Sequence, residues 1–167
     1  MNARKLTLCG IWVAALLLLT ASGAAAEGGF FTDFTGTSVN CKPVGMEALP
    51  VVHGGKLHMR DLVQECTDSA SDPRVAGTER IVIHGILDLN DNLSGPFWGT
   101  SVVTSGEGQW LAVWTGESTS DGFFYARMHA RGTGAYEGMQ AWWWLERLSS
   151  NPADATTFHG RILNPKP

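Results

Sequence analysis

The residues best suited to chemistry in this chain are five histidines, three cysteines and a few carboxylates, and their spacing matches no common catalytic motif. The histidines form no HxH or HxxxH pair, and no cysteine or carboxylate stands beside them at the spacing of metal ligands. A GxSxG nucleophile motif, a phosphate-binding loop and a GxGxxG turn are also missing from the sequence. We therefore predict no metal site and no cofactor, and the sequence leaves open whether the protein is an enzyme.

Two smaller constellations allow more than one interpretation. Asp61 and Glu65 share a face of one predicted strand, where paired carboxylates could serve acid–base chemistry, although we favour the interpretation as a solvated strand face. His84 and His129 each lie mid-strand between apolar neighbours. We interpret both histidines as packed core or lumen residues rather than as catalytic bases.

The first 26 residues have the pattern of a secretory signal peptide. Arg4 and Lys5 precede an apolar run from Ile11 to Leu19, and Ala24 and Ala26 supply the small residues of a cleavage site. The apolar run is too short to span a bilayer of about 30 Å, so we predict no stable membrane anchor. Residues 27–167 are then a single domain of a secreted or periplasmic protein.

Cleavage would leave two cysteines, Cys41 and Cys66, in an oxidising compartment. An even number of cysteines there favours one disulfide, which would stabilise the fold by roughly 3 kcal/mol, and two free buried thiols are the alternative. The formal net charge of −4 falls to −6 because Arg4 and Lys5 are lost, and no lysine or arginine run remains. We therefore predict that nucleic acid is not a partner.

The rest of the chain reads as an all-β domain. Short runs of β-branched and aromatic residues alternate with Gly, Asp, Asn, Ser and Pro, and no stretch has a helical apolar period. This pattern predicts strands near 56–67, 78–90, 97–105, 109–116, 122–131, 139–148 and 156–163, with an eighth in 30–40. Most of these strands are apolar on both faces, so we expect a subunit, a chain terminus or a ligand to cover the second face.

The run Trp142-Trp143-Trp144 presents that problem most clearly, because three adjacent indoles cannot all fit inside one small barrel. Trp142 and Trp144 point one way, and Trp143 and Leu145 point the other. The run allows three interpretations: a core pair with one outer tryptophan under a loop, a subunit interface, or the wall of a ligand site.

Three glycines between two predicted strands, in the segment from Arg131 to Met139, permit a tight corner. This G-T-G-x-Y-x-G corner and the aromatic strand after it resemble the allene oxide cyclase and dirigent group of β-barrels. The runs Gly95–Thr100 and Trp110–Gly116 are similar to hairpin strands of uncharacterised bacterial secreted members of that group. The resemblance covers roughly residues 56–163. It implies a small antiparallel eight-stranded barrel, often oligomeric, and matches no catalytic residue of the group to a position here.

The sequence thus predicts a barrel that binds a small apolar or aromatic molecule in its lumen. An isomerase or cyclase of allene oxide cyclase type and an oligomeric structural or interaction protein are the alternatives, so a homo-oligomer stays open. The candidate lumen residues are the aromatic and polar side chains of the central strands: Trp98, Trp110, Trp114, Phe123, Tyr125, Arg127, His129, Glu137, Trp142 and Trp144.

Overall fold

The computed structural model describes residues 30–46, 48–149, 151 and 154–165. The predicted signal peptide, residues 1–26, lies outside the described residues. The strands are β1 (Phe31–Met46), β2 (Val51–His53), β3 (Lys56–Ala70), β4 (Gly77–Asp88), β5 (Gly95–Ser105), β6 (Gly108–Ser118), β7 (Phe124–Gly134), β8 (Gln140–Arg147) and β9 (Thr156–Leu163). One 3₁₀ turn, η1 (Pro73–Val75), joins β3 to β4.

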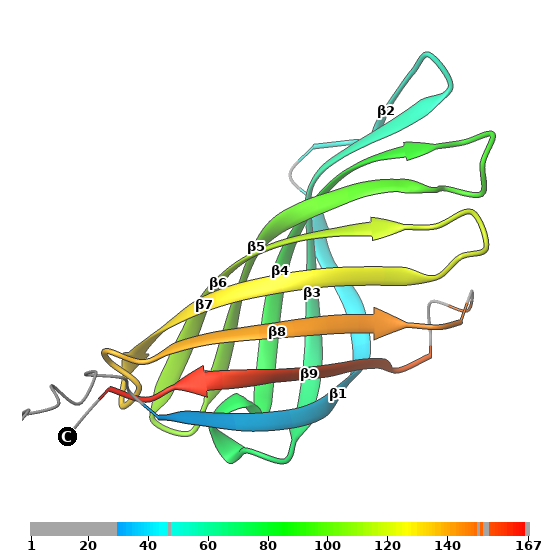
Figure 1. Ribbon diagram of the computed structural model, residues 1–167. Coiled ribbons are helices and arrows are strands. Elements are labelled where there is room, and N and C mark those ends of the chain that lie inside the picture. Colours follow the sequence, from blue (N-terminus) through cyan, green and yellow to red (C-terminus); the bar gives the residue numbers. More distant parts are fainter. Residues whose placement is uncertain (1–29, 47, 150, 152–153, 166–167) are drawn as a thin grey trace, which may run out of the picture.

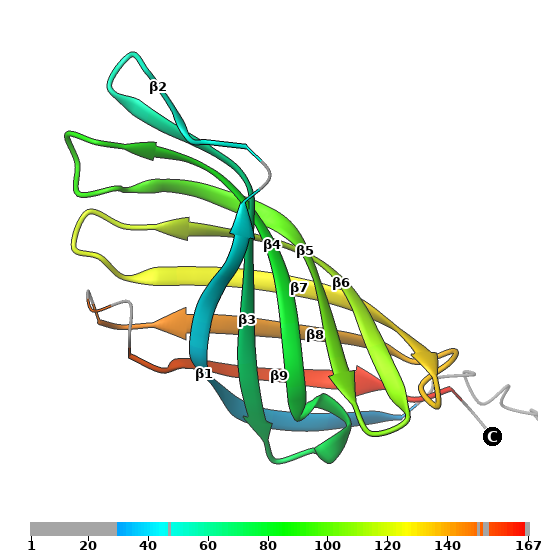
Figure 2. The ribbon, with the colours of Figure 1, turned by 180° about the vertical axis from the view of Figure 1, so that it is seen from behind.

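Eight antiparallel strands close into a barrel, which confirms the predicted fold class. Strands β3 to β9 follow one another as a meander, and β1 closes the ring by pairing with both β9 and β3. Figures 1 and 2 show β1 curving along the barrel so that its first half meets β9 and its second half meets β3. The short β2, which we did not predict, pairs only with the first residues of β3.

Side chains alternate between the interior and the exterior of the barrel along each strand. On β7, Ala126, Met128 and Ala130 are buried, whereas the residues between them are exposed. At one level three alanines are neighbours, since Ala130 pairs with Ala112 on β6 and with Ala141 on β8. At another level large side chains lie beside glycine, since Trp114 pairs with Gly99 and Trp143 with Gly160. Because the interior of an eight-stranded barrel is narrow, levels of alanine leave room for the indoles above and below them.

One end of the barrel is closed by η1 and by the β7–β8 turn. Trp110 is fully buried there, and its Nε1 donates a hydrogen bond of 2.7 Å to the Arg74 carbonyl in η1. Tyr136 stacks on Trp110 at a centroid distance of 5.3 Å and donates its hydroxyl to the Ser105 carbonyl at 2.7 Å. These contacts fill this end of the barrel with side chains.

The glycine corner of the β7–β8 turn has the geometry that the sequence predicts. Gly134 and Gly138 have φ angles of 64° and 82°, a region that side chains with a Cβ rarely adopt. A Cβ on Gly132 would lie 2.0 Å from the Tyr136 carbonyl oxygen. The glycines therefore let the turn fold back and press Tyr136 onto Trp110.

A disulfide joins Cys41 to Cys66 and so ties β1 to β3. Its position beside the β1–β3 pairing means that it reinforces the contact that closes the barrel. The alternative of two free buried thiols is therefore wrong.

Candidate functional site

A cavity of about 670 Å³ occupies the open half of the barrel. It extends toward Ser118, Phe124 and Arg147, which lie at the ends of β6, β7 and β8 opposite η1. Its wall is mainly apolar, and the apolar side chains that line it are Val39, Pro43, Met59, Leu62, Ile81, Ile83, Phe97, Trp114, Phe124, Ala126, Met128 and Leu145.

Three of the described ionisable side chains line this cavity, namely Glu79, Arg147 and Asp154, and of these Glu79 is the most deeply buried. Its side chain on β4 points inward, is only 2% exposed and lines the cavity together with Ile81. Asp68 on β3 also points inward and is 7% exposed, but it does not line the cavity. Since Cys66 pairs with Glu79 and Asp68 pairs with Gly77, the two carboxyl groups are diagonal neighbours on the inner face. Glu79 thus forms part of the cavity floor, with Asp68 behind it.

Burial changes the acidity of both groups. The pKa of Glu79 rises to about 8, mainly because burial penalises the charged carboxylate and also because the charge of Asp68 is close; the Ser101 side chain opposes the rise. Burial likewise raises the pKa of Asp68 to about 6, against an opposing effect of the Ser38 side chain. Both carboxyl groups therefore hold their protons to a higher pH than exposed carboxyl groups do.

In the described part of the chain, three buried polar atoms in or beside the cavity have no hydrogen-bond partner. They are Oδ1 of Asp68, Oε1 of Glu79 and Nε1 of Trp114. Trp114 on β6 is 6% exposed and lines the same cavity. Buried polar atoms are nearly always paired in folded proteins, so three at one site mark it as a candidate for binding.

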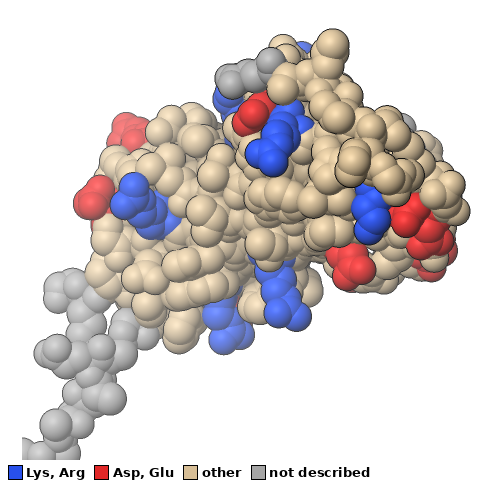
Figure 3. Space-filling model, turned by 90° about the horizontal axis from the view of Figure 1, so that it is seen from above, with Lys and Arg blue, Asp and Glu red and all other residues tan. Residues whose placement is uncertain are grey.

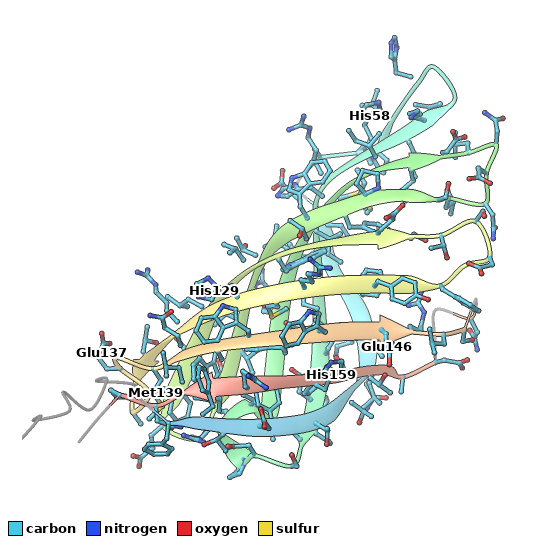
Figure 4. All side chains as sticks on the ribbon, in the orientation of Figure 1. His58, His129, Glu137, Met139, Glu146 and His159 are labelled. Carbon is cyan, nitrogen blue, oxygen red and sulfur yellow. A yellow bond between two sulfur atoms is a disulfide. The ribbon has the colours of Figure 1, made fainter. Side chains whose placement is uncertain are left out.

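Most of the predicted lumen residues lie elsewhere. Trp110 and Trp114 do point inward, and of these two only Trp114 lines the cavity. Phe123 lies in the loop before β7, and Glu137 is exposed in the β7–β8 turn, as Figure 4 shows. The others point outward, so their predicted place in the lumen was wrong: Trp98, Tyr125, Arg127, His129, Trp142 and Trp144.

The alternation of these strands was predicted correctly, but the large aromatic face was assigned to the wrong side. On β8 the inward residues are Ala141, Trp143 and Leu145, so only one of the three adjacent indoles enters the barrel. On β7 the inward residues are Ala126, Met128 and Ala130, and the larger Tyr125 and Arg127 face outward.

The outward residues form an aromatic ladder across β7, β8 and β9, which we define as His129, Trp142, Trp144 and His159. The His129 ring stacks on Trp142 at 5.1 Å, and the His159 ring stacks on Trp144 at 5.5 Å. Figure 4 shows the two histidines on either side of β8. His129 was interpreted as a core or lumen residue, and its exposed position corrects that interpretation.

The remaining charged candidates also lie on the outside of the barrel. Asp61 Oδ1 lies 3.8 Å from His84 Nδ1, and Glu65 Oε1 lies 3.4 Å from Arg80 Nη1, so the two carboxylates have different partners. His84 faces outward and lies against Trp98, so its interpretation as a core or lumen residue was also wrong. In the view of Figure 3, charged side chains of both signs are scattered over a largely uncharged surface.

Glu79 and Asp68 were missed by the sequence reasoning, although a signal was present. Glu79 stands two residues before Ile81 and four before Ile83, on the face that we predicted to be apolar. Asp68 lies one residue beyond the predicted strand 56–67, in a strand that in fact continues to Ala70. An acidic residue at the two-residue spacing of an apolar strand face is the pattern that would have identified the pair.

Comparisons with protein-family models, curated proteins and solved structures give no match to this chain. The resemblance to the allene oxide cyclase and dirigent group therefore stays a prediction. Among the described residues, no three His, Cys, Asp or Glu side chains group closely enough to hold a metal ion. The same part of the chain contains no helix with the length and apolar character to cross a membrane.

Proposed function

We propose that this protein binds a small, largely apolar molecule in the lumen of its barrel. The observation that carries the proposal is the cavity of about 670 Å³ with its mainly apolar wall. Ligand sites typically measure about 300–1,000 Å³ and combine apolar walls with a few polar groups, as this cavity does. The side chains that fill the η1 end keep the cavity separate from that end of the barrel.

A secreted or periplasmic location forms part of the same proposal. The disulfide between Cys41 and Cys66 supports it, because disulfides persist mainly in oxidising compartments. The predicted signal peptide of residues 1–26 supports it from the sequence. Detection of the purified protein as a chain beginning near Glu27 would test it directly.

Tryptophan fluorescence provides the binding assay, since Trp114 lines the cavity. We expect 4-propylphenol and 1-octanol to change the tryptophan emission with dissociation constants below about 1 mM. Ala126→Leu adds bulk at the cavity wall and should weaken this binding, whereas Thr115→Leu on the exposed outer face should not. Absence of binding below that concentration, or equal affinity of the two variants, would contradict lumen binding.

An isomerase or cyclase of allene oxide cyclase type is the second candidate. It requires an ionisable pair in the lumen, and the Asp68–Glu79 pair supports it. The test is incubation with an epoxide of an unsaturated fatty acid and a chromatographic search for a product of unchanged mass. Turnover by the wild type that is lost in Glu79→Gln would support an enzyme, and no turnover by the wild type would contradict it.

An oligomeric interaction protein is the third candidate, supported by the exposed apolar side chains around the aromatic ladder. Trp144 is 40% exposed and Val113 on the neighbouring outer face is 59% exposed. Sedimentation velocity distinguishes this candidate, because a strictly monomeric species at high protein concentration would contradict it.

A further inference from the structure

The Asp68–Glu79 pair differs from the acidic groups that pair with arginine in the described structure. On the surface, Glu65 pairs with Arg80 and Asp33 with Arg161. At the closed end, Asp72 pairs with Arg74 at 2.6 Å, which lowers the Asp72 pKa chiefly through that hydrogen bond. Within the described ranges, no ion pair includes Asp68 or Glu79.

Such an arrangement is energetically unfavourable for the protein alone. A carboxylate removed from water is normally paired with a cation, because an unpaired buried charge costs several kcal/mol. Here Glu79 is almost completely buried, its Oε1 has no partner, and the repulsion from Asp68 adds to the burial penalty. A positive charge beside Glu79 would offset both effects.

The position of the pair determines where that charge could come from. Glu79 lines the cavity floor, with the apolar side chains of Ile81 and Met128 also on the wall. A cation that reaches Glu79 through the lumen must therefore leave water, and an apolar body on the same molecule would make that transfer favourable.

We propose that the lumen binds an organic cation: a primary ammonium group on an apolar body, with the ammonium placed against the Glu79 carboxyl and Asp68 behind it. This inference rests on the proposed lumen-binding function and names the ligand class for that same site. The charges of the carboxyl pair and of the ligand are complementary, and the ammonium supplies donors to the unpartnered Glu79 Oε1.

Trp114 adds a second, independent feature of the site. Its Nε1 is a donor, it is buried without a partner, and its ring lines the same cavity. An oxygen atom in the ligand body would accept this hydrogen bond, which the ammonium cannot do. The best ligands are therefore amines that also carry a hydroxyl, ether or carbonyl oxygen.

A series of three molecules with the same chain tests the head group: octylamine, 1-octanol and octanoate, titrated into the wild-type protein at pH 7 by isothermal calorimetry. A hydrogen bond to a charged group is stronger than one between neutral groups, so octylamine should bind at least about tenfold more tightly than 1-octanol. Octanoate should also bind more weakly than octylamine, because its charge has the same sign as that of the carboxyl pair and its only cationic partner in the described cavity lining is Arg147, at the end of the barrel opposite η1.

Two variants locate the effect. Glu79→Gln should weaken octylamine binding at least about tenfold and leave 1-octanol binding nearly unchanged. Glu117→Gln, at an exposed position on the outside of β6, should change neither. If Glu79→Gln fails to fold, Asp68→Asn and the order of affinities in the wild type still decide the question.

The outcomes separate the two proposals. If 1-octanol binds as tightly as octylamine, or if octylamine binding is insensitive to Glu79→Gln, the cation inference is overturned while lumen binding stands. If none of the three molecules binds, both proposals are overturned.

Discussion

The buried Asp68–Glu79 pair predicts that the protein becomes less stable as the pH rises. A carboxyl group whose pKa is higher in the folded protein than in the unfolded chain binds its proton more tightly when folded. Below pH 4.5, the ordinary value for Glu79, both states are protonated and the penalty is absent. Between pH 4.5 and about 8 the unfolded chain releases the proton first, so the free energy of unfolding falls throughout this range.

The magnitude follows from the size of the pKa change. Each pKa unit corresponds to about 1.4 kcal/mol, so the rise from 4.5 to about 8 lowers the stability by roughly 5 kcal/mol above pH 8. Asp68 contributes in the same direction between 3.8 and about 6. Since domains of this size are stable by about 5–15 kcal/mol, the effect should be large enough to measure.

The assay is urea unfolding followed by tryptophan fluorescence at pH 5, 7 and 9. Glu79→Gln cannot ionise, so it should lose most of the pH dependence and exceed the wild-type stability at pH 9 by up to about 5 kcal/mol. Glu117→Gln, on the exposed outer face, should follow the wild type at every pH. Equal wild-type stability at pH 5 and pH 9, or an unchanged pH profile for Glu79→Gln, would refute this reasoning.

Three further predictions concern the closure of the barrel and are checked by the same unfolding assay at a single pH. Replacing Cys41 and Cys66 together by serine should lower the stability by roughly 3 kcal/mol, and equal stability with and without reductant would contradict this. Tyr136→Phe should lower the free energy of unfolding by about 1–3 kcal/mol, because the buried Ser105 carbonyl at the end of β5 loses its hydrogen-bond donor. A loss below about 0.5 kcal/mol would argue against a stabilising role for this hydrogen bond. Gly132→Ala should destabilise the protein by about 1–3 kcal/mol or more, because the added Cβ would collide with the Tyr136 backbone. Gly45→Ala is the control, because a Cβ at Gly45 would have no atom within 4 Å.

The barrel was predictable from the sequence because its strands are separated by clear turn residues. The strand predicted at 156–163 matches β9, and the one at 97–105 begins two residues after the observed start of β5. The strand β2 was missed because three exposed residues beside a Gly54–Gly55 turn give no apolar alternation. The local sequence pattern was sufficient to predict a strand wherever one face of that strand is buried.

The site was much less predictable, because alternation divides a strand into two faces without saying which face is inside. Trp142 and Trp144 were assigned to the lumen for their size, yet Trp143 is the indole that the interior accommodates. The decisive quantity is the width of the closed barrel, which depends on all eight strands together. Glu79 was missed for the same reason. The sequence of β4 alone does not show which face of the strand points into the barrel, so it does not show that Glu79 is buried.

The double pairing of β1 has a consequence for how the chain can reach its native state. Strands β3 to β9 can pair in the order in which they are synthesised, but Phe31 pairs with Leu163 and Thr32 with Ile162. The ring therefore cannot close until the last strand is available, and β1 and β8 present free edges until then. Free edges are templates for pairing with other chains. A chain truncated before β9 should aggregate rather than form a smaller barrel.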